Sequence, residues 1–190
     1  MKTPFDARES PLIRSALAFC VAAHCAIGQT RKYTGEHYYH HPIEVAGLMC
    51  DNAKGCTEEM IAAALLHDVV EDTQVPLEVI ATMFGTVVAG YVEQLTDVSK
   101  PEDGNRAARK AIDREHTAKA SPQAKTIKLA DLISNTISIV ESDPKFAHTY
   151  LAEKRLLLEV LTEGDTELYK MACDLAHPTL RDERAGNYPC

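Results

Sequence analysis

The stretch from residue 60 to 66 is apolar without interruption, and ionisable side chains follow it at once. A helix that is apolar on every side has to lie inside the core, so this segment is expected to be the central helix of the fold. Thr57 is placed to cap its start, with Glu58 and Glu59 at the positive end of the helix dipole. The ionisable groups that follow are His67, Asp68, Glu71 and Asp72.

These four groups need a counter-charge, because no Lys or Arg lies near them in the sequence. Burying them beside an apolar helix without a partner would be costly. The sequence therefore predicts that a cation reaches them from elsewhere in the fold, and a divalent metal ion is the natural candidate.

Helical periodicity extends through most of the chain, with Pro, Gly and capping residues between the periodic segments. Besides the central helix, the expected helices run from Pro11 to Gly28, from His41-Pro42 to before Gly55, and over 76–84, 87–95, 105–120, 122–141, 144–161 and 165–175. No stretch alternates with period two for long enough to form a strand. The predicted fold class is all-α, with one domain over residues 1–177 and a polar tail over residues 178–190.

Composition limits the function classes. The chain has 190 residues, enough for a domain with its own core. Its net charge of −8 argues against a DNA-coating or membrane-surface protein, so neither nucleic acid nor membrane is an expected partner. The longest uncharged stretch, 15–30, contains His24 and Gln29 and falls short of a membrane span. With no secretory signal and no CxxC pair, a cytosolic protein with reduced, mostly buried cysteines is expected.

Positive charge is concentrated between Lys100 and Lys128, where eight basic and four acidic residues give a local charge of +4. The plain interpretation is a solvated helix face. The alternative is a site for a small polyanion, because Arg106, Arg109 and Lys110 follow one another at i, i+3 and i+4 on one helical face. A small phosphorylated ligand fits one basic face on an acidic body better than a nucleic acid does.

Two further residues can complete a metal site. His41 lies at a predicted loop-to-helix junction, and Asp131 lies among apolar neighbours within a predicted helix. Together with His67 and Asp68 they form a mixed nitrogen and oxygen set that suits Mn, Fe or Co, with Zn as a further option. Water at an open position of such a site becomes a nucleophile toward phosphorus. Asn135, one turn after Asp131, shares its face and can donate to a neighbouring ligand.

Each of these residues also has a simpler interpretation. A single His on an apolar helix is more often a packed core residue than a metal ligand, and His40 competes with His41 for the ligand role. Asp131 alone is equally compatible with a buried hydrogen-bonding carboxylate. The metal hypothesis depends on the four residues taken together.

Several motifs occur in an order that is typical of one enzyme family. They are Arg31-Lys32 with Gly35, Tyr38 and His41-Pro42, then His67-Asp68 with Glu71-Asp72-Thr73, then Thr96-Asp97 with Arg106, Arg109 and Lys110, and finally Lys128-Leu-Ala-Asp131 with Asn135. In this order, between residues 31 and 161, the chain resembles the HD-type hydrolases of the Rel/Spo alarmone group. The resemblance is greatest to the stand-alone small alarmone hydrolases.

The resemblance implies an all-α HD-domain helical bundle that hydrolyses the 3′-pyrophosphate of (p)ppGpp-type nucleotides, with Mn²⁺ as cofactor. It implies that the metal ligands are His41, His67, Asp68 and Asp131. It implies that Glu71 and Asp72 are catalytic and orient or deprotonate the attacking water. It implies substrate contacts by Arg31 and Lys32 at the base and the nearby phosphate, by Arg106, Arg109 and Lys110 at the phosphates, and by Asn135 at the ribose.

Because of two departures from the family pattern, the sequence does not decide which nucleotide base the substrate carries. His37 stands where the family usually has Pro, and residues 99–106 differ from the usual spacing. Both border the expected nucleotide pocket, so an adenine alarmone, (p)ppApp, is an alternative to a guanine one. Two other functions are weighed: another HD phosphohydrolase, such as a nucleotidase or NADPH phosphatase, and a non-catalytic nucleotide-binding module. The Glu71-Asp72 pair argues against the last. Exposed apolar positions on the final helices are expected to form the interface of a homodimer.

Overall fold

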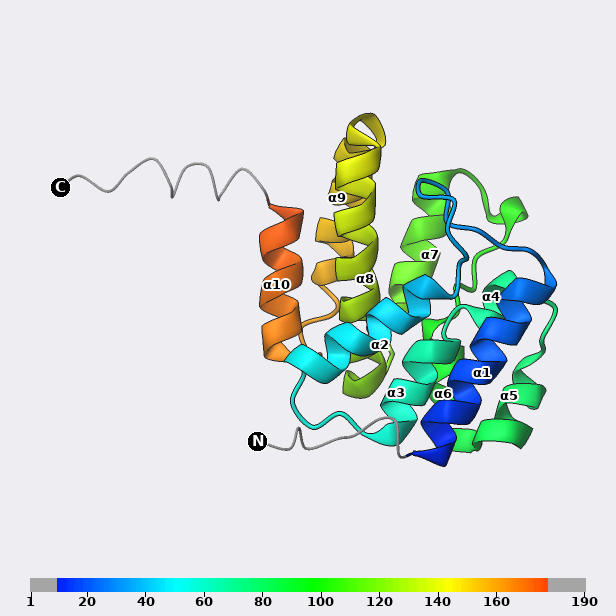
Figure 1. Ribbon diagram of the computed structural model, residues 1–190. Helices are drawn as coiled ribbons and strands as arrows, with labels where there is room; N and C mark the ends of the chain where they lie inside the picture. Colours follow the sequence, from blue (N-terminus) through cyan, green and yellow to red (C-terminus); the bar gives the residue numbers. More distant parts are fainter. Residues whose placement is uncertain (1–9, 178–190) are drawn as a thin grey trace.

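The computed structural model describes residues 10–177, and within them the chain folds into helices joined by short loops (Figure 1). The helices are α1 (Pro11–Ala26), α2 (His40–Asn52), α3 (Glu58–Leu66), α4 (Val69–Asp72), α5 (Leu77–Phe84), α6 (Thr86–Leu95), α7 (Arg106–Ala118), α8 (Pro122–Ser142), α9 (Pro144–Leu158) and α10 (Thr166–Ala176). A short 3₁₀ turn, η1 (Pro101–Asp103), precedes α7. Thr30 and His37 pair in an isolated bridge within the loop between α1 and α2. The all-α prediction is confirmed.

Helix α3 is the centre of the fold, as its sequence predicts. All its residues from 60 to 66 are buried, and the helix packs against α1, α2, α6 and α8 (Figure 1). The Thr57 side chain accepts a hydrogen bond of 3.3 Å from the amide of Met60, which is the expected N-cap. The position of α3 brings its C-terminal end into the middle of the bundle.

The chain does not continue as one helix beyond that end. Helix α3 stops at Leu66, His67 and Asp68 form a turn, and the separate short helix α4 begins at Val69. The periodicity of the sequence does not reveal this break, because all of these residues have helical backbone angles or stand beside helical neighbours. The turn directs two consecutive ionisable side chains toward the centre of the bundle.

The expectation of mostly buried cysteines is wrong for the described residues. Cys20 is buried, whereas Cys25 and Cys50 are exposed and Cys56 and Cys173 are half-buried. Cys25 follows Cys20 by five positions, which places it on a different face of α1. The predicted tail, 178–190, and the first nine residues of the predicted domain lie outside the described residues. Between residues 10 and 177, none of the helices combines the length and the apolar character needed to cross a bilayer.

Two glycines give a test of the packing around α8. A Cβ on Gly164 would lie 2.6 Å from the Leu129 side chain and 3.2 Å from the backbone of α8, whereas a Cβ on Gly47 in α2 would meet nothing within 4 Å. Gly164→Ala is therefore expected to lower the free energy of unfolding by about 1–3 kcal/mol through overpacking. Gly47→Ala is expected to raise it by about 0.5–1 kcal/mol, because Ala is the better helix former. Urea unfolding with a chelator present measures both, and a Gly164→Ala chain as stable as the wild type contradicts the packing described.

Candidate metal centre and adjoining cleft

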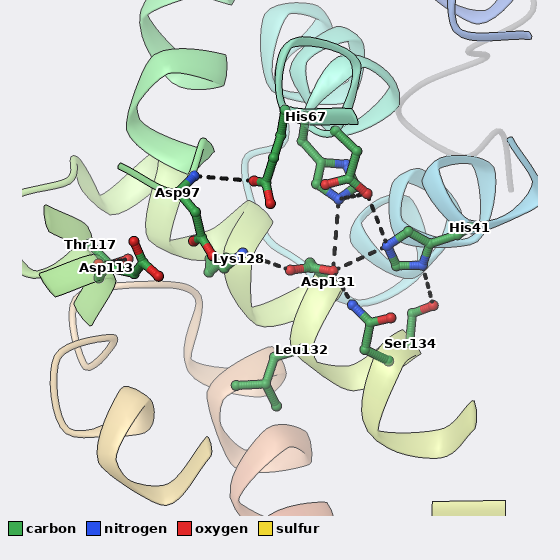
Figure 2. A network of polar contacts seen from close by, with 12 residues as sticks. His41, His67, Asp97, Asp113, Thr117, Lys128, Asp131, Leu132 and Ser134 are labelled. Carbon is green, nitrogen blue, oxygen red and sulfur yellow. Dashed lines mark hydrogen bonds and ion pairs between the residues drawn. The ribbon is translucent and has the colours of Figure 1, made fainter. Parts of the chain in front are cut away.

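Four side chains from three parts of the fold converge beside the end of α3 (Figure 2). We call them the His/Asp cluster: His41 at the start of α2, His67 and Asp68 in the turn after α3, and Asp131 in α8. The Nε2 atom of His41 lies 3.6 Å from Asp68 Oδ2 and 3.2 Å from Asp131 Oδ1. The Nε2 atom of His67 lies 3.1 Å and 3.7 Å from the same two oxygens. The structure thus brings together all four predicted ligands.

The two imidazole rings are oriented so that their Nε2 atoms face the cluster. His67 Nδ1 lies 2.8 Å from the carbonyl oxygen of Ala64, so it carries the hydrogen of that bond. His41 Nδ1 lies 3.0 Å from the buried hydroxyl of Ser134. Both Nε2 atoms are buried and make no well-formed hydrogen bond. Two such nitrogens facing carboxylate oxygens are a donor set that fits a divalent transition metal.

The electrostatics of the cluster agree with that fit. Burial opposes a charge on His67, but the adjacent carboxylate of Asp68, with help from Asp131, raises the pKa of His67 well above its usual range. Burial likewise opposes the charge of Asp131, but the ammonium of Lys128 holds the pKa of that carboxyl well below its usual range. Burial opposes the charge of Asp68 too, but the neighbouring His67 lowers its pKa, so both carboxylates are charged at neutral pH and attract a cation.

Neighbouring side chains fix the two carboxylates. Lys128 Nζ lies 2.9 Å from Asp131 Oδ2, and Asn135 Nδ2 donates to Asp131 Oδ1 at 2.6 Å. The Tyr38 hydroxyl donates to Asp68 Oδ2 at 2.6 Å. The amide of Asn135, which the sequence predicts to face a bound nucleotide, is thus directed at Asp131 in this structure.

Ser134 gives a direct test of the metal centre. Its hydroxyl fixes the ring of His41 from behind, and such supporting contacts are worth about 10–100-fold in metal affinity. Ser134→Ala is expected to weaken Mn²⁺ binding by that factor, measured by titration of the metal-free chain. Ser142→Ala, at an exposed position of the same helix, is the matched control. Equal affinity of the two variants would contradict the ligand role of His41.

The predicted catalytic carboxylates lie on α4, on the solvent side of the cluster. Glu71 Oε2 accepts a hydrogen bond of 3.1 Å from the amide of Asp97. Although Glu71 is an exposed residue, desolvation of its carboxyl group, followed by the charge of Asp97, raises its pKa to about 7. Asp72 Oδ2 accepts a hydrogen bond of 2.8 Å from Gln29, and desolvation followed by the charge of Asp68 raises the pKa of Asp72.

A cleft beside α4 collects the predicted phosphate-binding residues. Arg106, Arg109 and Lys110, which we call the α7 cations, line a cavity of about 750 Å³ together with Glu71 and Asp97. The grouping on one helical face that the sequence predicts is therefore present. Two of these cations already have carboxylate partners. The Arg106 guanidinium binds both carboxylate oxygens of Glu153, at 2.7 and 2.8 Å, and Lys110 Nζ lies 2.7 Å from Asp97.

The two basic residues predicted to contact the base lie in the loop before α2. Arg31 pairs with Glu44 at 3.1 Å. The ammonium of Lys32 lies 4.9 Å from the ring centre of Tyr33 and 5.9 Å from that of Phe146. Neither residue makes a hydrogen bond or an ion pair with the His/Asp cluster among the described contacts.

Comparison with known proteins identifies the family to which the chain belongs. The HD domain family matches the chain over residues 16–156, which is most of its length. The chain belongs to the HD domain family. The matched region contains the whole His/Asp cluster, both α4 carboxylates and the α7 cations. Helix α10 lies after the end of the matched region.

Relatives match the chain over different parts of its length. The HD domain chain is 38% identical over 107 residues to the guanosine-3′,5′-bis(diphosphate) 3′-pyrophosphohydrolase MESH1 of Drosophila melanogaster, and the match covers 56% of this chain and 58% of that protein. It is 32% identical over 139 residues to the protein of the same name from Xenopus tropicalis, covering 72% and 74% of the two chains. This chain thus spans less than two thirds of the Drosophila relative.

A solved structure supports the fold of this HD domain over most of its length. It is described as "A metazoan ortholog of SpoT hydrolyzes ppGpp and plays a role in starvation responses", and it superposes with a TM-score of 0.79 at 28% identity. The match covers 90% of this chain and 96% of that one. The predicted HD-type helical bundle is therefore confirmed.

Sequence reasoning missed the side chains that position the site. Ser134 and Gln29 reach His41 and Asp72 over 93 and 43 residues of chain. Tyr38 appears in the opening motif, but its contact with Asp68 has no signal in the sequence. Of these contacts, only that of Lys128 could be predicted from the sequence. Lys128 precedes Asp131 by about one helical turn in the HD domain, and residues at i and i+3 of a helix can form an ion pair.

Proposed function

We propose that the chain is a metal-dependent hydrolase that removes the 3′-pyrophosphate of alarmone nucleotides, (p)ppGpp or (p)ppApp, releasing pyrophosphate and the nucleoside 5′-di- or triphosphate. The observation that supports this most is the position of Glu71. It follows Asp68 of the His/Asp cluster by three residues and lines the same cavity as the α7 cations. Glu71, as the base that would activate water, therefore lies between the candidate metal centre and the candidate phosphate-binding residues. Two relatives are named for this reaction.

In this proposal the His/Asp cluster holds Mn²⁺. When bound, the ion supplies positive charge for the phosphoryl oxygens and acidity for water. Glu71 takes a proton from the attacking water while an oxygen–phosphorus bond forms and the bond from phosphorus to the 3′-oxygen breaks. The proton then passes to the departing 3′-oxygen, and pyrophosphate leaves. A pKa of about 7 makes Glu71 a stronger base than an ordinary glutamate.

The remaining site residues bind the substrate in this proposal. The α7 cations hold the phosphates, Arg31 and Lys32 contact the base, and Asn135 faces the ribose. Phosphate binding then requires Arg106 and Lys110 to exchange their carboxylate partners, Glu153 and Asp97, for phosphate oxygens. Charge-assisted contacts of this kind suit phosphates of high negative charge, such as the two diphosphates of an alarmone.

A product assay tests the reaction. The metal-stripped chain receives Mn²⁺ and, in separate reactions, ppGpp, ppApp and NADPH, and anion-exchange chromatography resolves the products. Pyrophosphate with GDP or ADP is the expected result, and the relative rates identify the base. Inorganic phosphate from NADPH alone would replace the proposal with a phosphatase activity. Ligand binding without any product over hours would replace it with a nucleotide-binding module.

We further propose a cytoplasmic enzyme that forms a homodimer through α8 and α9. Ile137, Val140 and Leu156 are exposed large apolar residues on these helices, and burying such side chains favours association. Light scattering is expected to give twice the chain mass of 20.9 kDa. A mass equal to that of one chain would contradict the dimer.

A further inference from the structure

A second cavity lies behind the proposed catalytic cleft, between α7, α8 and α9. Its open volume, part of which is continuous with solvent, is about 670 Å³. Asp97, Lys110 and Asp113 line both this cavity and the cleft, so the two adjoin. No residue of the His/Asp cluster lines it, and neither does either α4 carboxylate.

The cavity contains more positive charge than its acidic groups neutralise. Its cations are Lys110, Arg114, Lys128 and Lys154, and its acids are Asp97, Asp113 and Glu153. Every acid already has a cationic partner. Lys110 lies 2.7 Å from Asp97 and 3.5 Å from Asp113, and Arg106 binds Glu153. Asp113 also accepts hydrogen bonds from the amides of Val98 and Ser99.

Two of the cations are left without an acidic partner. Lys128 pairs with Asp131, but Arg114 and Lys154 make no hydrogen bond or ion pair within residues 10–177. Both side chains are half-buried. The ammonium of Lys154 instead lies 4.8 Å from the ring centre of Tyr150. Burial and the neighbouring charge of Lys128 lower the pKa of Lys154 to about 8, so a bound anion would stabilise the charged form of this lysine.

We propose that this cavity is a second anion site, which binds a pyrophosphate group on Arg114 and Lys154. The wall formed by Ala107, Leu156 and Leu157 is apolar and offers a contact surface to an attached nucleoside. The pyrophosphate group can therefore come from free pyrophosphate or from a nucleoside diphosphate. The site does not depend on the proposed reaction, because neither the metal cluster nor Glu71 contributes to it.

The site has a direct connection to the metal centre. Lys128 lines the cavity, and its ammonium pairs with Asp131 of the His/Asp cluster at 2.9 Å. An anion in the cavity competes with Asp131 for that ammonium. Occupancy of the second site is therefore expected to change the environment of one metal ligand without any contact to the metal.

Calorimetric titration of the full chain at pH 7 without added metal tests the proposal. Inorganic pyrophosphate and GDP are the two probes. Lys154→Met and Arg114→Gln are each expected to weaken binding at least about tenfold, because a hydrogen bond to a charged group is lost. Lys170→Met, at an exposed position of α10, is the matched control and is expected to bind like the wild type. Thermal unfolding of each variant checks that it is folded.

The two probes distinguish the source of the anion. If both variants weaken GDP binding and GDP binds more tightly than pyrophosphate, the site takes a nucleoside diphosphate. If they weaken pyrophosphate binding and GDP does not bind, it takes the free anion. The proposal is overturned if the wild type shows no saturable binding of either probe, or if Arg109→Gln abolishes binding while Lys154→Met and Arg114→Gln leave it unchanged. None of these outcomes depends on turnover.

Discussion

Glu71→Gln is expected to lower kcat by about 10²–10⁴-fold and to leave metal content unchanged, because general-base catalysis typically contributes that factor. The amide oxygen of glutamine can still accept the hydrogen bond from Asp97, so the local structure is expected to persist. Glutamine cannot take a proton from water at neutral pH. Product formation from ppGpp or ppApp gives kcat, and elemental analysis of the purified variant gives metal content.

The matched control for this substitution is Glu78→Gln. Glu78 is an exposed glutamate of α5 and has no contact with the cleft. Its variant is expected to keep wild-type kcat. An active Glu71→Gln enzyme with wild-type metal content would remove the catalytic role of Glu71, whereas loss of the metal would assign Glu71 to the metal centre instead.

The pH dependence of the rate provides a second measurement on Glu71. A general base acts in its deprotonated form, so the rate is expected to rise with pH through the pKa of this carboxyl. That pKa is about 7 in the metal-free chain. A divalent cation in the neighbouring cluster favours the negative carboxylate and moves the rise to lower pH. The residual activity of Glu71→Gln is expected to lack this rise.

The central helix and the convergence of the four predicted ligand residues are the parts of the structure that the sequence predicts best. An uninterrupted apolar run has no exposed face, so residues 60–66 could lie only in the core. The candidate ligands could be proposed because a metal site requires side chains such as His and Asp, and because His67, Asp68 and Asp131 stand beside apolar residues. His67 and Asp131 illustrate this, since both follow or interrupt a stretch of core residues.

The supporting contacts are not predictable in the same way. Whether Ser134 reaches His41 depends on how α8 packs on α2, and no local sequence pattern predicts that packing. The charge pattern predicts that the α7 cations share one face, but not that Glu153 of the distant helix α9 binds Arg106. The break between α3 and α4 also escapes sequence reasoning, because turn residues with helical backbone angles leave no gap in the periodicity.

Asp131→Asn is expected to lower both metal binding and stability, for two separable reasons. The substitution removes a predicted metal ligand, and it also leaves Lys128 without its charged partner. The two side chains of this ion pair are only 18% and 9% exposed. Breaking a buried pair by removing one partner typically lowers the free energy of unfolding by about 3–5 kcal/mol. Urea unfolding with a chelator present is expected to show a loss toward the lower end of that range, since Lys128 keeps some contact with water.

A double variant separates the two effects. Lys128→Met added to Asp131→Asn removes the unpaired ammonium and keeps the methylene packing, so most of the lost stability is expected to return. Metal binding is expected to remain lost, because the Asp131 carboxylate is still absent. Asp174→Asn, at an exposed position of α10, is the matched control and is expected to change neither property. If Asp131→Asn binds Mn²⁺ like the wild type, Asp131 serves only as the partner of Lys128, and the metal is held by His41, His67 and Asp68, whose ligand atoms lie within 4.8 Å of one another.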